Sequence, residues 1–263
     1  MTSVVNEILG SADYFILLVF RVGGLVFTSP IFGRVNIPQR AKIIFTVALG
    51  YLFFTLFPQT TAITYSTLIG FLFLCAGELL LGIALAFVTN IFFALTAFTA
   101  GQLIDMQVGY GIVNVYDIQN NTQAPMMGNV LNLMLLIVFF AVGNHLRLIE
   151  MIYLTIGRMP IGTLVFSPGI GMVALEVFSR AFMMGVMMAL PILASGLTLE
   201  IALGVMMRMV PQIHMFVVGI PLKMIVGLVV FTVTLPVFVG FSSRIFGEMF
   251  SGIEKMFATF VGG

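Results

Sequence analysis

The sequence has no tryptophan, a single cysteine, two histidines and few charged residues. Only 8% of its 263 residues are charged, whereas about a quarter is usual in a soluble globular domain. One cysteine cannot build a disulfide framework or a thiolate metal site, so Cys75 is best explained as a small buried apolar side chain. The net charge of +1 provides no clustered basic face for nucleic acid. These absences exclude a soluble domain, a disulfide scaffold and a nucleic-acid-binding protein.

Apolar runs fill most of the sequence, and hydrophobic residues make up 60% of it. Several runs are long enough for a helix to cross the roughly 30 Å hydrocarbon core of a bilayer. Proline and glycine interrupt the later runs, which indicates kinked helices whose freed carbonyls are satisfied by neighbouring protein. We therefore predict an all-α integral membrane protein with long, kinked and broken helices that form hairpins. The runs cover residues 14–32, 43–57, 68–100, 130–142, 172–203 and about 218–241.

The run at 68–100 is too long for a simple crossing, because a helix of that length measures about 50 Å. It either projects from the bilayer or folds back near its glycines. Three apolar runs separate the basic turns at 33–42 and 143–160. If each run crosses the bilayer once, the two turns lie on opposite sides, whereas their positive charge predicts that both are cytoplasmic. The topology therefore suggests helices that are held inside a larger assembly.

A few charged residues stand inside or beside the apolar runs. A charge in hydrocarbon costs several kcal/mol, so such residues normally pair or face protein or water. We predict that Arg21 pairs with Glu78, with a proton relay or an intersubunit contact as alternatives. Glu176 and Arg180 lie four residues apart, where they can neutralise each other. The full set, for which structural pairing is the favoured role, is Arg21, Glu78, Glu176, Arg180, Arg208 and Lys223.

The only long polar segment runs from residue 100 to 128 and contains no Lys or Arg. Lipid cannot satisfy an irregular backbone, so this segment must line water or protein. We predict that 101–109 ends a long helix, with Gln102 and Asp105 on one face, and that 117–128 leads into the next helix. Between them we predict a movable plug that closes a pore. It consists of Gly109, Tyr110, Gly111, Ile112, Val113, Asn114, Val115 and Tyr116.

No catalytic or metal-binding pattern stands out. The sequence has no HExxH, GxSxG or phosphate-binding loop, and no ligand stands at metal spacing beside His145. We predict no enzymatic activity, no cofactor and no metal. A channel or gate component fits the polar segment best, because such a segment can line or plug a passage. A proton-coupled transporter that uses Glu78 and Glu176 is the alternative, although we detect no repeated halves.

Three segments carry a resemblance to a known family. They are RVGGLVFTSPIFGRVNIPQRAKI, then GELLLGIALAF with AGQLIDMQVGYG, and last RMVPQIHMFVVGIPLKMIVGL. In this order and over nearly the whole length, they resemble the FliR/type III secretion export-apparatus family, which flagella share with virulence secretion systems. The segment VVGIPLK favours the flagellar branch of the family over a virulence type III secretion homologue.

The resemblance implies a non-enzymatic, multi-pass subunit of the export gate in the bacterial inner membrane, at the flagellar basal body. Such a subunit forms a helical hetero-oligomeric ring with FliP and FliQ, and much of that ring stands above the bilayer plane. The ring passes unfolded flagellar proteins, while FlhB and FlhA work on its cytoplasmic side. Residues 1–263 would form one export-gate domain that contacts membrane lipid. Its parts would be N-terminal helices (1–100), the central loop (101–128), C-terminal helices (129–241) and an amphipathic tail (242–263). A membrane assembly scaffold is the plainest alternative.

Overall fold

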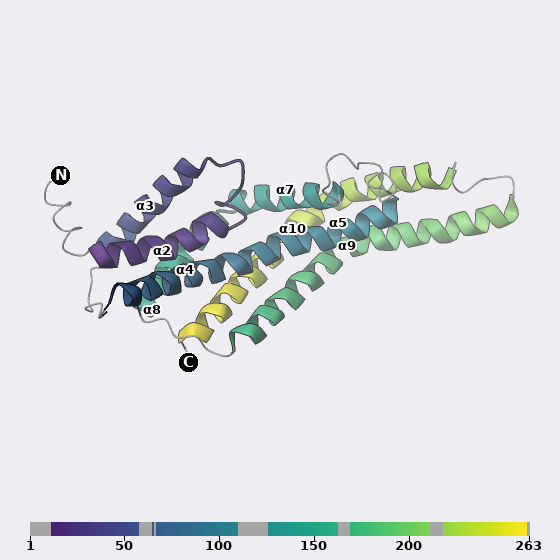
Figure 1. Cartoon of the computed structure of the whole chain (residues 1–263). Helices are drawn as coiled ribbons and strands as arrows, with labels where there is room; N and C mark the ends of the chain where they lie inside the picture. Colours follow the sequence, from purple (N-terminus) through teal and green to yellow (C-terminus); the bar gives the residue numbers. More distant parts are fainter. Residues whose placement is uncertain are drawn as a thin grey trace. The chain divides into compact units, whose positions relative to one another are not determined.

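The computed structural model describes residues 12–57, 65, 67–109, 126–162, 169–210 and 218–261. Helices dominate these ranges, which contain no strand, so the prediction of an all-α membrane protein is confirmed (Figure 1). The helices are α2 (Ala12–Thr28), α3 (Gln39–Leu56), α4 (Leu68–Asn90), the π-helical turn η1 (Ile91–Leu95), α5 (Thr96–Val108), α7 (Met126–Ala141), α8 (Asn144–Arg158), α9 (Ile170–Met209) and α10 (Ile220–Val261).

Four of the described helical stretches are long and apolar enough to cross a membrane. A fifth is possible if α7 and α8, which meet at a bend of 72°, form one broken span. The stretch Leu68–Val108 joins α4, η1 and α5 into 41 continuous helical residues, about 60 Å in length. No proline interrupts it, and η1 absorbs the irregularity as a π-helical turn. The fold-back alternative is therefore wrong, and this helix exceeds the thickness of a bilayer.

The chain divides into two compact units. The first unit contains the described residues of 1–90, 143–177 and 249–263, and the second contains those of 91–142 and 178–248. Helices α9 and α10 therefore contribute residues to both. Each unit is described by itself below.

The first unit is built around α2, which packs against α3 and α4 (Figure 1). Leu17, Leu18 and Val22 on α2 are fully buried. At Gly24 and Gly82 the backbones of α2 and α4 touch, because a Cβ at either glycine would lie 2.9 Å from the other's Cα. Only glycine allows so close an approach, and the two glycines therefore fix where α2 and α4 cross.

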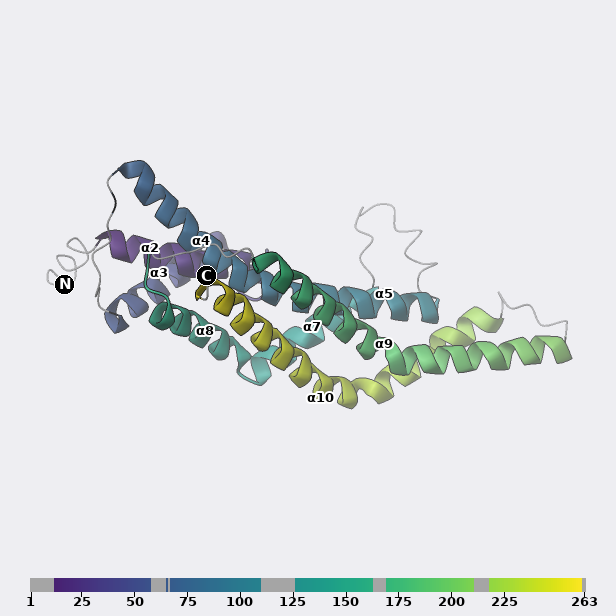
Figure 2. The same ribbon diagram turned by 90° about the horizontal axis from the view of Figure 1, so that it is seen from below.

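The end of α10 belongs to the first unit and runs beside α8 (Figures 1 and 2). Phe250, Ile253 and Met256 are buried there, and the guanidinium carbon of Arg147 lies 4.4 Å from the centre of the Phe250 ring. The amphipathic pattern found at 242–263 thus forms the last turns of a continuous α10 rather than a separate helix.

The second unit centres on α5 and α7. A Cβ at Gly101 would collide with the backbone of Gly128, so these two helices also touch through glycine. Farther along, the ring centroid of Phe93 lies 5.3 Å from that of Phe139, which lies 5.2 Å from that of Phe246. The aromatic cluster ties η1, α7 and α10 together.

Candidate functional site

Arg21 and Glu78 form a buried ion pair in the first unit. The guanidinium Nε of Arg21 lies 2.5 Å from Glu78 Oε2, and the two side chains are 0% and 1% exposed. Each residue lies close to the glycine crossing of α2 and α4, which positions the two side chains against each other. The structure therefore brings together the two charged residues that the sequence places in separate apolar runs.

This ion pair also holds the turn that follows α8. Arg21 Nη1 donates to the carbonyl of Met159 at 3.1 Å, and the backbone N–H of Gly162 donates to Glu78 Oε1 at 2.7 Å. Gly162 has a φ of +86°, a conformation that glycine adopts without strain. Both Glu78 oxygens are thus engaged, and the pair links α2, α4 and the 159–162 turn. Sequence reasoning missed these backbone partners, since no local pattern marks them.

Three ion pairs join charged residues of α9 to charged residues of α10. Arg180 Nη1 lies 2.6 Å from Glu248 Oε2, and Lys223 Nζ lies 2.6 Å from Glu200 Oε1, both in the second unit. In the first unit, Lys255 Nζ lies 2.6 Å from Glu176 Oε1. Sequence reasoning singled out one member of each pair and missed Glu200, Glu248 and Lys255. The charges of opposite sign on the two successive long helices could have indicated these three partners.

Arg208 is exposed in the last turn of α9. A cation there is favourable, because the C-terminal end of a helix carries a partial negative charge.

The central polar segment begins in a helix, as predicted. Helix α5 ends at Val108, and Gly109 caps it with a φ of +89° while its N–H donates to the Asp105 carbonyl at 3.0 Å. Asp105 is buried whereas Gln102 is exposed, so these two polar residues do not share one environment as the sequence led us to expect. Of the predicted plug, Gly109 is described, and Tyr110–Tyr116 lie outside the described residues.

Both ends of the segment 110–125 are held together. Asp105 Oδ1 accepts a hydrogen bond from the backbone N–H of Met127 at 3.3 Å, in the first turn of α7. A carboxylate is favourable at this position, because the first N–H groups of a helix have no partner within it and carry a partial positive charge. The contact between Gly101 and Gly128 joins the same two helices. The chain thus leaves α5 and returns to α7 at one place.

Within the described ranges, no three His, Cys, Asp or Glu side chains gather closely enough to hold a metal ion. Eight of the charged side chains described above form ion pairs between helices instead. Long apolar helices, a buried ion pair and a polar segment between joined helix ends are typical of a polytopic membrane protein.

Comparison with known proteins shows the family to which this chain belongs. Residues 12–249 match the bacterial export proteins, family 1, and the chain belongs to this family. It is similar to the flagellar biosynthetic protein FliR of Escherichia coli (strain K12), with 29% identity over 88% of this chain and 87% of that protein. The FliR proteins of Bacillus subtilis (strain 168) and Aquifex aeolicus (strain VF5) are 28% and 27% identical, over 88% and 93% of this chain. The aligned regions span 90% and 94% of these two FliR proteins. The chain is thus a protein of bacterial export, and the resemblance seen in its sequence is confirmed.

Proposed function

We propose that this chain is a core subunit of the flagellar type III protein export gate. With FliP and FliQ it would form the channel that passes unfolded flagellar proteins across the bacterial inner membrane, at the flagellar basal body. FlhB and FlhA would act on its cytoplasmic side. Membership of the export family and similarity to flagellar FliR proteins support this assignment. We infer a conducting and scaffolding role rather than a catalytic one.

The observation that supports an assembly is the length of the apolar helices. Helix α9 has 40 residues and α10 has 42, so each is about 60 Å long. Exposed apolar side chains occur at both ends of α9, where Met172 and Met209 are 75% and 77% exposed. A hydrocarbon core of roughly 30 Å covers only half of such a helix. The apolar side chains that stay exposed outside that core require protein partners, because a large exposed apolar surface in water is costly.

The apolar surface near the α9–α10 connection is where we expect one such partner. It lies beyond the Glu200–Lys223 ion pair and consists of Ile201, Val205, Met206, Met209 and Val218, which are all exposed. A partner helix with a matching apolar face would bury this surface and exclude water.

We further propose that residues 109–116 act as a plug that closes the channel between rounds of export. The support is the anchoring of both ends of the segment by Asp105, Gly101 and Gly128. With α5 and α7 held together at this place, a closure between them would not require the two helices to move. The glycines and bulky tyrosines in its sequence suit a closure that yields to a passing chain.

Copurification tests the assembly. A tagged chain coexpressed with FliP and FliQ should retain both partners through detergent extraction. The double substitution Ile201→Glu, Met209→Glu should remove them, because two carboxylates cannot enter an apolar interface without a large desolvation penalty. The matched control is Arg208→Gln, which changes an exposed polar side chain on the same turns and adds no carboxylate to the apolar surface. Loss of neither partner in the double variant, or no copurification at all, would refute the proposed contact.

The transporter alternative has weaker support. Glu78 is bonded through both oxygens to Arg21 and Gly162, and Glu176 pairs with Lys255. Carriers of a mobile proton need an oxygen that can release its partner during the cycle. If the chain is a scaffold without a pore, replacing residues 110–116 will cause no ion leakage.

A further inference from the structure

Two of the three ion pairs between α9 and α10 lie at opposite ends of a charge-free stretch. The pairs are Arg180–Glu248 and Glu200–Lys223, each at 2.6 Å. Between them, residues 181–199 of α9 and 224–243 of α10 contain no Asp, Glu, Lys, Arg or His. At 1.5 Å per residue each stretch is about 30 Å long, which matches the hydrocarbon core of a bilayer. We call these two stretches the apolar belt.

Five of the six hydroxyl side chains in the apolar belt are satisfied within their own helices, and the sixth, Ser243, stands at its end. Their oxygens donate to a carbonyl three or four residues earlier, at 2.7 to 2.9 Å. In hydrocarbon an unpaired donor costs several kcal/mol, about the full value of a lost hydrogen bond. These side chains therefore present no free donor to a surrounding lipid. They are Ser195, Thr198, Thr232, Thr234 and Ser242.

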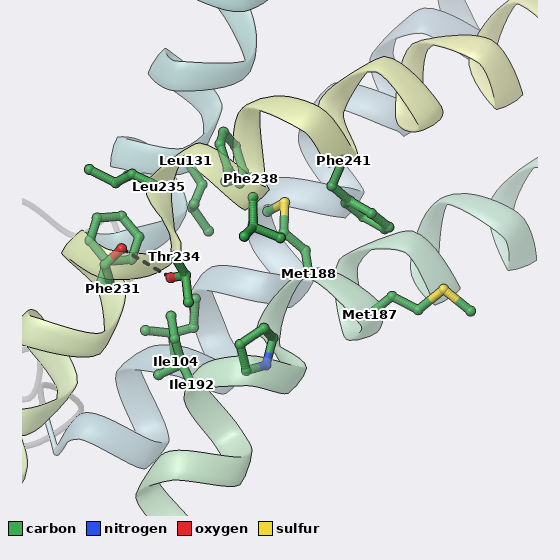
Figure 3. A pocket seen from close by; sticks show the side chains of 12 residues that line it. Ile104, Leu131, Met187, Met188, Ile192, Phe231, Thr234, Leu235, Phe238 and Phe241 are labelled. Atoms are coloured by element: carbon green, nitrogen blue, oxygen red, sulfur yellow. Dashed lines mark hydrogen bonds between the residues drawn. The ribbon is translucent and has the colours of Figure 1, made fainter.

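A pocket opens in the middle of the apolar belt (Figure 3). It is lined by four helices of the second unit, through Ile104 of α5, Leu131 of α7, Met188 of α9 and Phe238 of α10. Thr234 is the one polar side chain in the lining, and its hydroxyl also donates to the Phe231 carbonyl at 3.0 Å. The pocket thus offers no charge and no free donor to an occupant.

One rim of the pocket reaches the outside of the helices. Met187 and Val237 line it and are both exposed. Pro191, also in the lining, lies 11 residues from Arg180 and 9 from Glu200. Each of these charged residues is therefore about 15 Å from Pro191 along α9. A lipid headgroup could not reach this depth.

We propose that this pocket holds an acyl chain of a membrane lipid, and that the apolar belt is the part of the protein that lies in hydrocarbon. The belt has the thickness of that core, charges mark both of its limits, and the pocket at its middle is lined almost entirely by apolar side chains. The proposal does not depend on the export partners, since it concerns only residues of this chain and lipid.

The absence of tryptophan makes a direct test possible. Full-length single-tryptophan variants would be reconstituted in phosphatidylcholine vesicles whose acyl chains carry bromine, either near the terminal methyl or near the glycerol. Phe238→Trp reports on the pocket, Val233→Trp on the outer face of the belt, and Phe92→Trp on a fully buried site. Bromine quenches tryptophan only near contact, so the emission measures lipid access.

We expect Phe238→Trp and Val233→Trp to lose more than half of their emission with bromine near the terminal methyl, and less with bromine near the glycerol. Phe92→Trp should keep its emission. Quenching of Val233→Trp alone would show that the pocket excludes lipid and overturn the acyl-chain site. No quenching at Val233→Trp, or equal quenching at Phe92→Trp, would also count against the proposal. Copurification with FliP and FliQ is measured separately, so failure of either proposal can be told from failure of the other.

Discussion

Gly24 of α2 and Gly82 of α4 meet backbone to backbone, one helical turn from Arg21 and Glu78. Two features thus act at one crossing. The glycines let the helices approach, and the buried ion pair becomes possible because they do. Either feature can be tested alone.

The Gly82→Ala substitution should destabilise the first unit. The new methyl group would overlap the carbonyl oxygen of Arg21, which is backbone and cannot move aside as a flexible side chain would. We expect a loss of about 1–3 kcal/mol, typical of overpacking, seen as a lower unfolding temperature in detergent. Gly240→Ala is the control, because a Cβ there meets nothing within 4 Å. Equal unfolding temperatures for the two variants would contradict the close crossing.

Removing one member of the buried pair should cost more than removing both. Glu78→Leu leaves the fully buried Arg21 guanidinium without its counter-ion, for which we expect a loss of about 3–5 kcal/mol. The double variant Arg21→Met, Glu78→Leu should recover much of that loss, because no unpaired charge remains.

The exposed pair supplies the control for that experiment. Arg180 and Glu248 are 41% and 28% exposed, and an exposed pair is worth only about 0–1 kcal/mol. Glu248→Gln should therefore change the unfolding temperature little. If Glu78→Leu proves as mild as Glu248→Gln, the Arg21–Glu78 pair contributes nothing to stability.

The sequence predicted contacts best for residues whose burial is energetically unfavourable unless they find a partner. An arginine and a glutamate in separate apolar runs must find partners, so the Arg21–Glu78 pair could be anticipated from composition and position. The helical end at Val108 was equally predictable from Gly109. Partners on the backbone, such as Met159 and Gly162, could not be predicted, because any residue carries a carbonyl and most carry an N–H. The burial of Asp105 but not Gln102 depends on the position of α7, which no local pattern encodes.

Asp105 should control how firmly the central segment is anchored. In Asp105→Ala, the buried N–H of Met127 loses its acceptor, which costs about 1–3 kcal/mol. We expect α5 and α7 to separate more often and the closed gate to leak ions, measured as faster dye release from vesicles that hold the complex. Gln102→Ala is the matched control, since Gln102 is exposed on the same helix. Equal release by both variants would show that this hydrogen bond does not govern closure.

The plug itself can be removed without touching its anchors. Replacing residues 110–116 with a Gly/Ser linker of equal length keeps Gly109 as the cap of α5 and keeps Asp105 bonded to Met127, but it removes the tyrosines and aliphatic side chains that would fill a pore. We expect ions and small solutes to cross the inner membrane of cells that carry this variant, while FliP and FliQ still copurify. A linker that replaces 118–124 is the control, because it leaves the predicted plug intact. If the 110–116 variant neither leaks nor alters secretion, the segment only contacts neighbouring subunits, and the pore is closed by another part of the assembly.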